Sequence, residues 1–491
     1  MIKQIALLPL DSRPCNVKFP HYVARISGVP LILPPTEALG NLKDEGRLDE
    51  ISMWLERAVG ETDILILSLD MLVFGGLAHS RRTAIDTDEA LSRLRIVSKL
   101  KEKDPRLKIH AFSIIMRPSI TVYDERSAKL WSEISEYLMA GDKGDHHKLD
   151  QLKNEIPKDV LEGYFKTRER NHEVNMSAIK LVDKGLIDLL ILGTDDAMSY
   201  GPQAKEKSIL LRTIEKHGLS DRVKVIDGAD EIAAMLVSRI RAEGSGTSPK
   251  VSIVYSNSKH KRVISLYEDV SVERTIADHV ETAGGIICDD DSGCDIKLFV
   301  NTPEKHQEDL FLSSPKGKGK INEEMLLEIK NNRKLSAVAD IRYCNGADAE
   351  LVSQMLEREL FMGLSSFSGF NTTSNSVGIA LAHSIAYFLS GRDSDALKCH
   401  RELLMHSLLS DYLYQSVVRP EIIEYLKSDN RSVIDISGSI EQTGYLLEEK
   451  MVERREELID PHLGIKDFKI DNIRLPWGRL FEIDMDIRSV V

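Results

Sequence analysis

Short runs of apolar, largely β-branched residues alternate along the chain with polar clusters and amphipathic stretches. The apolar runs are continuous, as in parallel strands that are covered on both faces. Between them, helical periodicity predicts amphipathic helices, so the alternation predicts an α/β chain. The helices are expected at about 86–102, 176–184, 230–243, 272–283, 348–360 and 376–389. The strands are expected at 5–10, 30–35, 63–69, 108–116, 188–193, 223–227, 250–256, 285–288, 296–301, 336–341 and 362–370.

This distribution of strands predicts two domains, each with a doubly wound parallel sheet. A stretch rich in Gly, Ser and Pro at 242–250 separates the first six strands from the last five and is typical of a domain boundary. We therefore expect an N-terminal α/β domain over 1–245, with a helical insertion at about 124–180, and a C-terminal α/β domain over 250–491 with a helical tail. The alternative is a single (β/α)8-like barrel with insertions, which would close with eight strands. We expect the segment 473–487 to return one strand to the sheet.

Composition narrows the classes of function. The net charge is −13, from 65 basic and 78 acidic residues, which argues against a general nucleic-acid-binding protein. The basic stretch at 316–320 is interrupted by glycines and is expected to be a solvated loop. No apolar run reaches the roughly 18 residues of a membrane span, and the N-terminal apolar run is too short for a signal peptide, so we expect a cytoplasmic protein that does not enter membranes. The sequence does not indicate an oligomeric state.

The cysteines indicate reduced thiols. Their number is odd and no CxxC spacing occurs, so neither a disulfide framework nor a structural zinc site is expected. They are Cys15, Cys288, Cys294, Cys344 and Cys399.

Charged and amide side chains follow almost every predicted strand. In parallel α/β folds, ligands bind outside the carboxyl ends of the strands, so these side chains are expected to meet at one site. Any one of them could be a helix N-cap, but N-caps do not explain two successive aspartates, or arginines after three strands. The pattern predicts a site for a small polar substrate. The expected binding residues are Asp11, Arg13, Asp70, His79, Arg81, Arg117, Tyr200, Asp230, Asn345, Asp348, Phe370 and Asn371.

Asp195 and Asp196 are the expected catalytic residues. Adjacent carboxylates at the end of a strand point in different directions, so burial can raise the pKa of one while hydrogen bonds keep the other ionised. The flanking Gly193 and Gly201 are typical of a tight turn. The alternative is that Asp195 caps the following helix and Asp196 is a solvated neighbour.

Two further motifs leave alternatives open. Arg13 precedes a proline and is therefore extended, so it either binds a substrate anion or hydroxyl or forms a structural pair with Asp11. The segment GGLAHSRR at 75–82 matches neither the P-loop nor the dinucleotide-binding fingerprint, although an anion could bind there.

A set of motifs in order along the chain resembles a bacterial family of unknown function. The resemblance covers roughly residues 4–480, implies one family unit of this length and supplies no reaction. Phe370 stands where family members often carry Trp, so a ring is retained. The motifs are PLDSRP (9–14), SLDMLVFGGLAHSR (68–81), GTDDAMSYG (193–201), NGAD (345–348), GFNTTSN (369–375) and LPWGRLFE (475–482).

The strand–Asp–Asp–turn segment is also similar to the adjacent aspartates of the substrate-assisted hexosaminidases. This resemblance implies that Asp195 orients the acetamido group of a substrate and that Asp196 is the general acid. Those enzymes use a barrel, so a fold of two sheets would count against it.

These observations together predict a carbohydrate-active hydrolase that acts on a small glycoside or amino-sugar conjugate without a cofactor. One alternative is a metal-dependent sugar isomerase or phosphohydrolase that holds Mg²⁺ or Mn²⁺ with an acidic cluster. The ligands of this cluster would be Asp11, Asp70, Asp195, Asp196 and Asp230. A second alternative is a non-catalytic, two-lobed protein that closes on a polar ligand.

Overall fold

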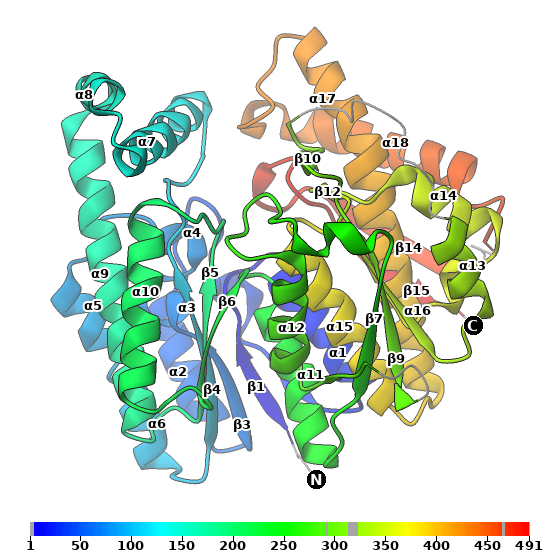
Figure 1. Ribbon diagram of the computed structural model, residues 1–491, viewed down its shortest axis with the longest axis horizontal. Helices are drawn as coiled ribbons and strands as arrows, with labels where there is room; N and C mark the ends of the chain where they lie inside the picture. Colours follow the sequence, from blue (N-terminus) through cyan, green and yellow to red (C-terminus); the bar gives the residue numbers. More distant parts are fainter. Residues whose placement is uncertain (1–3, 290–292, 313–322, 464–466, 491) are drawn as a thin grey trace.

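Two separate parallel β-sheets form the framework of the protein (Figure 1). The computed structural model describes residues 4–289, 293–312, 323–463 and 467–490. Within these residues, all strands of each sheet pair in parallel, and no strand of one sheet pairs with a strand of the other. The predicted α/β fold with two parallel sheets is therefore confirmed, and a single barrel does not form among these residues. This fold counts against the resemblance to the substrate-assisted hexosaminidases, which use a barrel.

Both sheets follow the same strand order. It is β2-β1-β3-β4-β5-β6 in the first sheet and β13-β11-β9-β7-β8 in the second, so the first strand of each lies between its second and third. Each of the predicted apolar runs overlaps one of these strands. The first sheet contains β1 (Ile5–Leu8), β2 (Leu31–Ile32), β3 (Ile64–Ser68), β4 (Lys108–Ile115), β5 (Leu189–Thr194) and β6 (Val223–Asp227). The second contains β7 (Lys250–Tyr255), β8 (Ile286–Ile287), β9 (Ile296–Asn301), β11 (Leu335–Asp340) and β13 (Ser366–Ser368).

Helices cover both faces of each sheet. The predicted helix at 86–102 divides into α5 and α6, and the predicted insertion forms α7, α8 and most of α9 (Figure 1). The helices of the first half are α1 (Pro14–Ile26), α2 (Leu48–Ala58), α3 (Leu69–Phe74), α4 (Leu77–Ser80), α5 (Thr87–Arg93), α6 (Ile96–Lys103), α7 (Glu125–Lys143), α8 (His146–Glu155), α9 (Lys158–Asp183), α10 (Gly201–Lys216) and α11 (Ile232–Ser245). Those of the second half are α12 (Val272–Thr282), α13 (Glu323–Asn331), α14 (Ala349–Glu357), α15 (Thr373–Leu389), α16 (Ser394–Ser407), the π-helix η5 (Leu408–Val418), α17 (Arg419–Ser428) and α18 (Ile440–Leu458).

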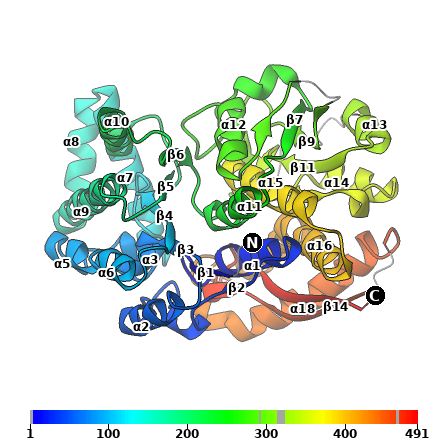
Figure 2. The same ribbon diagram turned by 90° about the horizontal axis from the view of Figure 1, so that it is seen from below.

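The two sheets share one layer of helices. Figure 2 shows α1, α11 and α15 between the sheets. Alternate side chains of the strands face this layer, so Leu7 of the first sheet and Leu298 of the second belong to the same continuous apolar core. The opposite faces have cores of their own, around Leu8 and Phe299. The predicted boundary at 242–250 falls on the end of α11 and a short connection to β7, while the apolar core continues across the two halves.

The C-terminal segment differs from the prediction. It does not return a strand to either main sheet, because β14 (Phe468–Arg474) and β15 (Asp484–Ser489) pair with each other in an antiparallel ribbon. A tight turn over Pro476–Gly478, with Trp477 at a φ of 58°, reverses the chain between them. A second two-stranded pair, β10 (Glu308–Asp309) with β12 (Tyr343–Cys344), lies near the carboxyl ends of the second sheet (Figure 1).

No helix in the described ranges is both long enough and apolar enough to cross a membrane. The basic stretch at 316–320 lies outside the described residues.

The shared core predicts that the two halves unfold together. Leu381 of α15 is fully buried in this core, so Leu381→Ala should lower the free energy of unfolding by about 2–5 kcal/mol. Urea unfolding followed by circular dichroism and by tryptophan fluorescence should give coincident single transitions. Leu327→Ala, at a position that is 58% exposed, is the control and should change stability by about 0.5 kcal/mol or less. Two separated transitions would contradict the shared core.

Candidate functional site

A cavity of about 450 Å³ lies where the carboxyl ends of the two sheets meet. Its walls come from both halves of the chain, since the loops after β1, β5 and β6 face segments after β12 and β13 and the turn between β14 and β15. Helix α7 of the insertion adds Trp131. Nine of the residues predicted from the sequence line this cavity: Asp11, Arg13, Arg81, Arg117, Asp195, Asp196, Asp230, Asn345 and Asn371.

Three other predicted residues do not line this cavity, because each takes part in a structural contact. Asp348 caps α14 by accepting a hydrogen bond from the backbone N–H of Glu350 at 3.1 Å. Phe370 lies in the shared core, edge to face with Phe19 at 6.0 Å between ring centroids, and is not a free stacking surface. Asp70 is buried on α3, where its Oδ2 accepts from the backbone N–H of Ile114 at 2.9 Å.

His79 and Tyr200 open onto separate cavities. His79 shares a cavity of about 390 Å³ with Lys43 and Arg82, on the other side of α4. Tyr200 lines a cavity of about 300 Å³ beside Asp142 of the insertion. Both residues lie several positions beyond the end of a strand, on α4 and at the N-cap of α10, and neither lines the common cavity.

Arg13 occupies the base of the cavity in a cage of carboxylates. Its Nη2 donates to Asp11 Oδ2 at 2.8 Å and to Asp230 Oδ1 at 2.6 Å, and its Nε donates to both oxygens of Asp11. Asn16 Nδ2 donates to Asp11 and Asp230 as well. Of the two roles open to Arg13, the structural pair with Asp11 is therefore present, and it is extended by Asp230, 217 residues away.

Asp195 and Asp196 each face a different arginine. Arg81 Nη2 donates to Asp195 Oδ2 at 2.5 Å, and Arg117 Nη1 donates to Asp196 Oδ2 at 2.9 Å. A quarter of the Asp196 side chain is exposed, so its carboxyl group opens onto the cavity. Burial and the neighbouring Asp195 raise the pKa of Asp196, whereas Arg117 and Arg81 oppose that rise. The two carboxylates thus have distinct environments.

The turn that carries the two aspartates is held by close packing. A side chain at Gly193 would place its Cβ 2.4 Å from the carbonyl oxygen of Gly228, so only glycine fits there. After the turn, Gln203 Nε2 donates to the carbonyl oxygen of Asp195 at 2.8 Å. Asp196 itself has a φ of 41°, a left-handed conformation that costs free energy for a residue with a side chain.

Such strained residues concentrate at the cavity. Among the described residues, nine other than glycine have a positive φ, and five of these line it. Strain of this kind persists where the surroundings enforce it and clusters at functional sites. The five are Asp196, Tyr267, Asn345, Asn371 and Trp477.

Aromatic rings and a fourth arginine complete the walls. The ring of Trp477 contacts two guanidinium groups, with the Cζ of Arg13 at 5.2 Å and that of Arg479 at 5.3 Å from its centroid. Its indole Nε1 donates to Ser12 Oγ at 2.9 Å, which ties the C-terminal turn to the segment after β1. The lining residues that were not singled out from the sequence include Trp131, Tyr267, Asp309, Phe311, Trp477, Arg479 and Phe481. Trp477, Arg479 and Phe481 belong to the motif LPWGRLFE, which was the available signal for them.

The π-helix η5 fixes this aromatic wall from behind. Tyr414 donates to the carbonyl oxygen of Leu480 at 2.8 Å, and Gln415 donates to that of Phe481 at 2.9 Å. Arg419, at the start of α17, donates to the carbonyl oxygen of Asn345 at 2.8 Å. Single π-bulges are found mostly at functional sites, where they redirect side chains, and this longer π segment supports two walls of one cavity.

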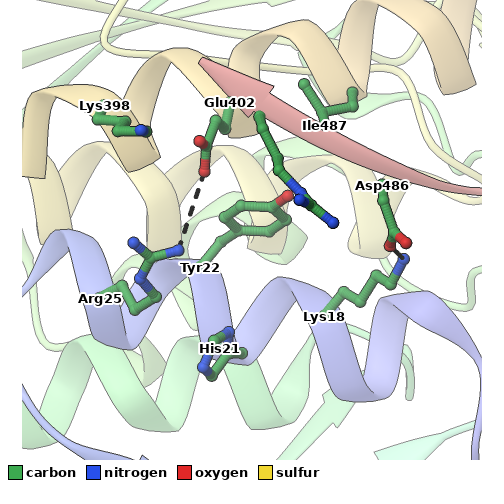
Figure 3. Close-up of a pocket in the computed structure, with 9 residues that line it drawn as sticks. Lys18, His21, Tyr22, Arg25, Lys398, Glu402, Asp486 and Ile487 are labelled. Carbon is green, nitrogen blue, oxygen red and sulfur yellow. Dashed lines mark hydrogen bonds and ion pairs between the residues drawn. The ribbon is translucent and has the colours of Figure 1, made fainter. Parts of the chain in front are cut away.

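A second polar cavity, of about 490 Å³, lies between α1, α16 and β15 and contains none of the predicted residues (Figure 3). Lys18 forms ion pairs with Asp486 at 2.7 Å and Asp484 at 2.6 Å, and Arg25 pairs with Glu402 at 3.9 Å. The pairs of Lys18 attach β15 to α1, and Glu402, which pairs with Arg25, also accepts from the backbone N–H of Ser489 at 2.9 Å. The groups around this cavity therefore serve the packing of β15 against α1 and α16.

The metal-dependent alternative named Asp11, Asp70, Asp195, Asp196 and Asp230 as ligands. Four of these carboxylates are engaged by Arg13, Arg81 or Arg117, and Asp70 is bonded to the backbone. Within the described part of the chain, no group of three or more His, Cys, Asp or Glu side chains is arranged to hold a metal ion.

A comparison with known protein families gives a match over nearly the whole chain. The family model described as "Protein of unknown function (DUF4127)" matches residues 5–486. The chain belongs to the DUF4127 family. The resemblance to a family of unknown function is thereby confirmed, and a search of curated proteins found no match. DUF4127 membership covers both sheets and the cavity between them but assigns no reaction.

The buried Asp70 predicts a pH dependence of stability. Burial raises the pKa of Asp70 to about 7, whereas the unfolded chain releases this proton near the ordinary value of 3.8. Between these values the folded protein binds more protons, so the contribution of Asp70 to stability falls as pH rises. Asp70→Asn removes the titration and should therefore gain stability relative to wild type on going from about pH 5 to about pH 8. Urea unfolding at both pH values measures this, and an equal difference at the two would contradict it.

Proposed function

We propose that this DUF4127 protein hydrolyses a glycosidic bond in a small carbohydrate, with Asp196 as proton donor. The carrying observation is that a carboxyl group with a raised pKa opens onto a cavity that also offers aromatic rings and amides. The volume of about 450 Å³ lies within the range of roughly 300–1,000 Å³ that is typical of small-molecule sites. Rings such as Trp131 and Tyr267 suit the apolar faces of sugars, and Asn345 and Asn371 suit hydroxyl groups.

In this mechanism the two aspartates divide the work. The bond between the anomeric carbon and the leaving oxygen breaks while that oxygen takes the proton of Asp196. Asp195, held by Arg81 at 2.5 Å, orients the group that approaches the anomeric carbon from the opposite side. In an amino-sugar conjugate this group is the acetamido oxygen of the substrate. Asp196, now ionised, then takes a proton from the water that completes hydrolysis.

A non-catalytic binding protein is the second candidate. The observation in its favour is that both halves of the chain line the cavity and that arginine–aspartate pairs occupy much of its base. Binding without turnover distinguishes this candidate from the hydrolase.

Asp196→Asn should reduce kcat/KM by about 10²–10⁴-fold, because a general acid typically contributes that much. Since Asp196 must be protonated to act, the wild-type rate should also fall as pH rises through its pKa, and this alkaline limb should vanish in the variant. The assay uses a panel of nitrophenyl glycosides and N-acetylhexosaminides, with and without EDTA.

Asp221→Asn is the matched control, because Asp221 is exposed and lies away from the cavity lining. Its activity and melting temperature should equal those of wild type. Full turnover in Asp196→Asn would remove Asp196 as the acid. Loss of activity with EDTA and recovery with Mn²⁺ would favour the metal-dependent alternative, and binding without turnover of any substrate would favour the binding protein.

A further inference from the structure

Arg479 differs from the other three arginines that line the cavity. Arg13, Arg81 and Arg117 each form an ion pair with an aspartate at 2.9 Å or less. Arg479 has no carboxylate oxygen within 4.0 Å of its nitrogen atoms among the described residues, and its buried Nε lacks a hydrogen-bond partner. A buried guanidinium N–H without an acceptor is unfavourable unless a ligand supplies one.

Charges of both signs act on Arg479. Arg13 and Arg479 both lie against the ring of Trp477, and the positive charges of Arg13 and Arg117 lower the pKa of Arg479, whereas Glu482 and Asp11 raise it. Glu482 Oε1 lies 3.9 Å from Arg13 Nε, and Asp11 accepts a hydrogen bond from Nη2 of the same arginine. Burial and these neighbouring cations lower the pKa of Arg479 to about 10, which leaves it protonated at neutral pH.

Contacts within the protein hold the side chain of Arg479 in place without a ligand. Its guanidinium Cζ lies 5.3 Å from the ring centroid of Trp477 and 5.7 Å from that of Phe481, which restricts its orientation. The carbonyl oxygens of the two following residues are held by Tyr414 and Gln415 of the π-helix. A planar guanidinium group with a fixed orientation can bind a carboxylate or phosphate through two parallel hydrogen bonds.

We propose that the substrate is an acidic sugar, whose carboxylate or phosphate group binds Arg479 while the sugar ring lies over the neighbouring aromatic side chains. The identification of the ligand as a sugar rests on the proposed function, whereas the anion site rests on Arg479 and its surroundings. Arg81 and Arg117 also have a buried Nε without a partner and can contribute further donors to the same ligand.

The test measures binding, so it does not require turnover. Calorimetric titrations of the full chain with D-glucuronate, D-glucose 6-phosphate and D-glucose compare a carboxylate, a phosphate and a neutral sugar. We expect one of the anionic sugars to bind about 10- to 100-fold more tightly than glucose, since hydrogen bonds to charged groups contribute this much. The affinity for that sugar should fall with added NaCl, whereas the affinity for glucose should not.

Arg479→Gln should abolish the preference, so that the anionic sugar binds no more tightly than glucose, while Arg479→Lys should retain part of the preference because the charge remains. Arg106→Gln removes one charge from a side chain that is 92% exposed, and it should bind like wild type. Equal affinity for neutral and anionic sugars, or an unchanged preference in Arg479→Gln, would overturn the acidic-sugar proposal while leaving a carbohydrate function in place. Failure of all three sugars to bind would overturn both, and binding of inorganic phosphate and acetate as tightly as the sugars would support the anion site and overturn the carbohydrate function.

Discussion

The packing of both sheets against one layer of helices is the constraint on which the rest of the structure depends. Helices α1, α11 and α15 bury one face of each sheet in a single apolar core. Because this layer fixes the sheets relative to each other, the carboxyl ends of both open on the same side (Figure 1). The polar residues that follow separate strands are thereby brought to one cavity, and the ion pairs of Arg13 with Asp11 and Asp230 are a consequence of that arrangement.

Most of the framework could be predicted because many of the strands are buried on both faces. This burial produces the continuous apolar runs that stand out in the sequence, as in β3 and β5. The edge strand β8 was recognised from its β-branched residues, although both of its isoleucines are exposed. The ribbon of β14 and β15 was not predicted, since its reversal depends on the left-handed Trp477, and nothing in the apolar pattern distinguishes a ribbon from a strand that rejoins a sheet.

A position after a strand predicted several residues of the candidate site, but it did not suffice where packing decides the direction of the side chain, as for Asp70, which follows β3 and is buried. Asp11 and Asp195 follow β1 and β5 and line the cavity, as the general rule for parallel sheets requires. His79 also follows a strand end, but α4 carries it to another cavity. Tyr267 and Trp131 come from a loop and an inserted helix, for which the sequence pattern gives no direction. Tertiary contacts alone bring them to the site.

The shared layer also governs how a ligand can reach the cavity. In a protein whose lobes have separate cores, opening a hinge exposes little apolar surface. Here a hinge motion between the sheets would have to separate side chains such as Leu7 and Leu298 from a core that they have in common, and the exposed apolar area would make an open form costly. Entry and exit therefore depend on the parts of the cavity wall that lie outside this core, which include Trp131 of α7 and Val433 and Ile434 from the segment after α17. The rate of ligand exchange is then set by local motion in these parts of the wall, independently of the global stability of the two sheets.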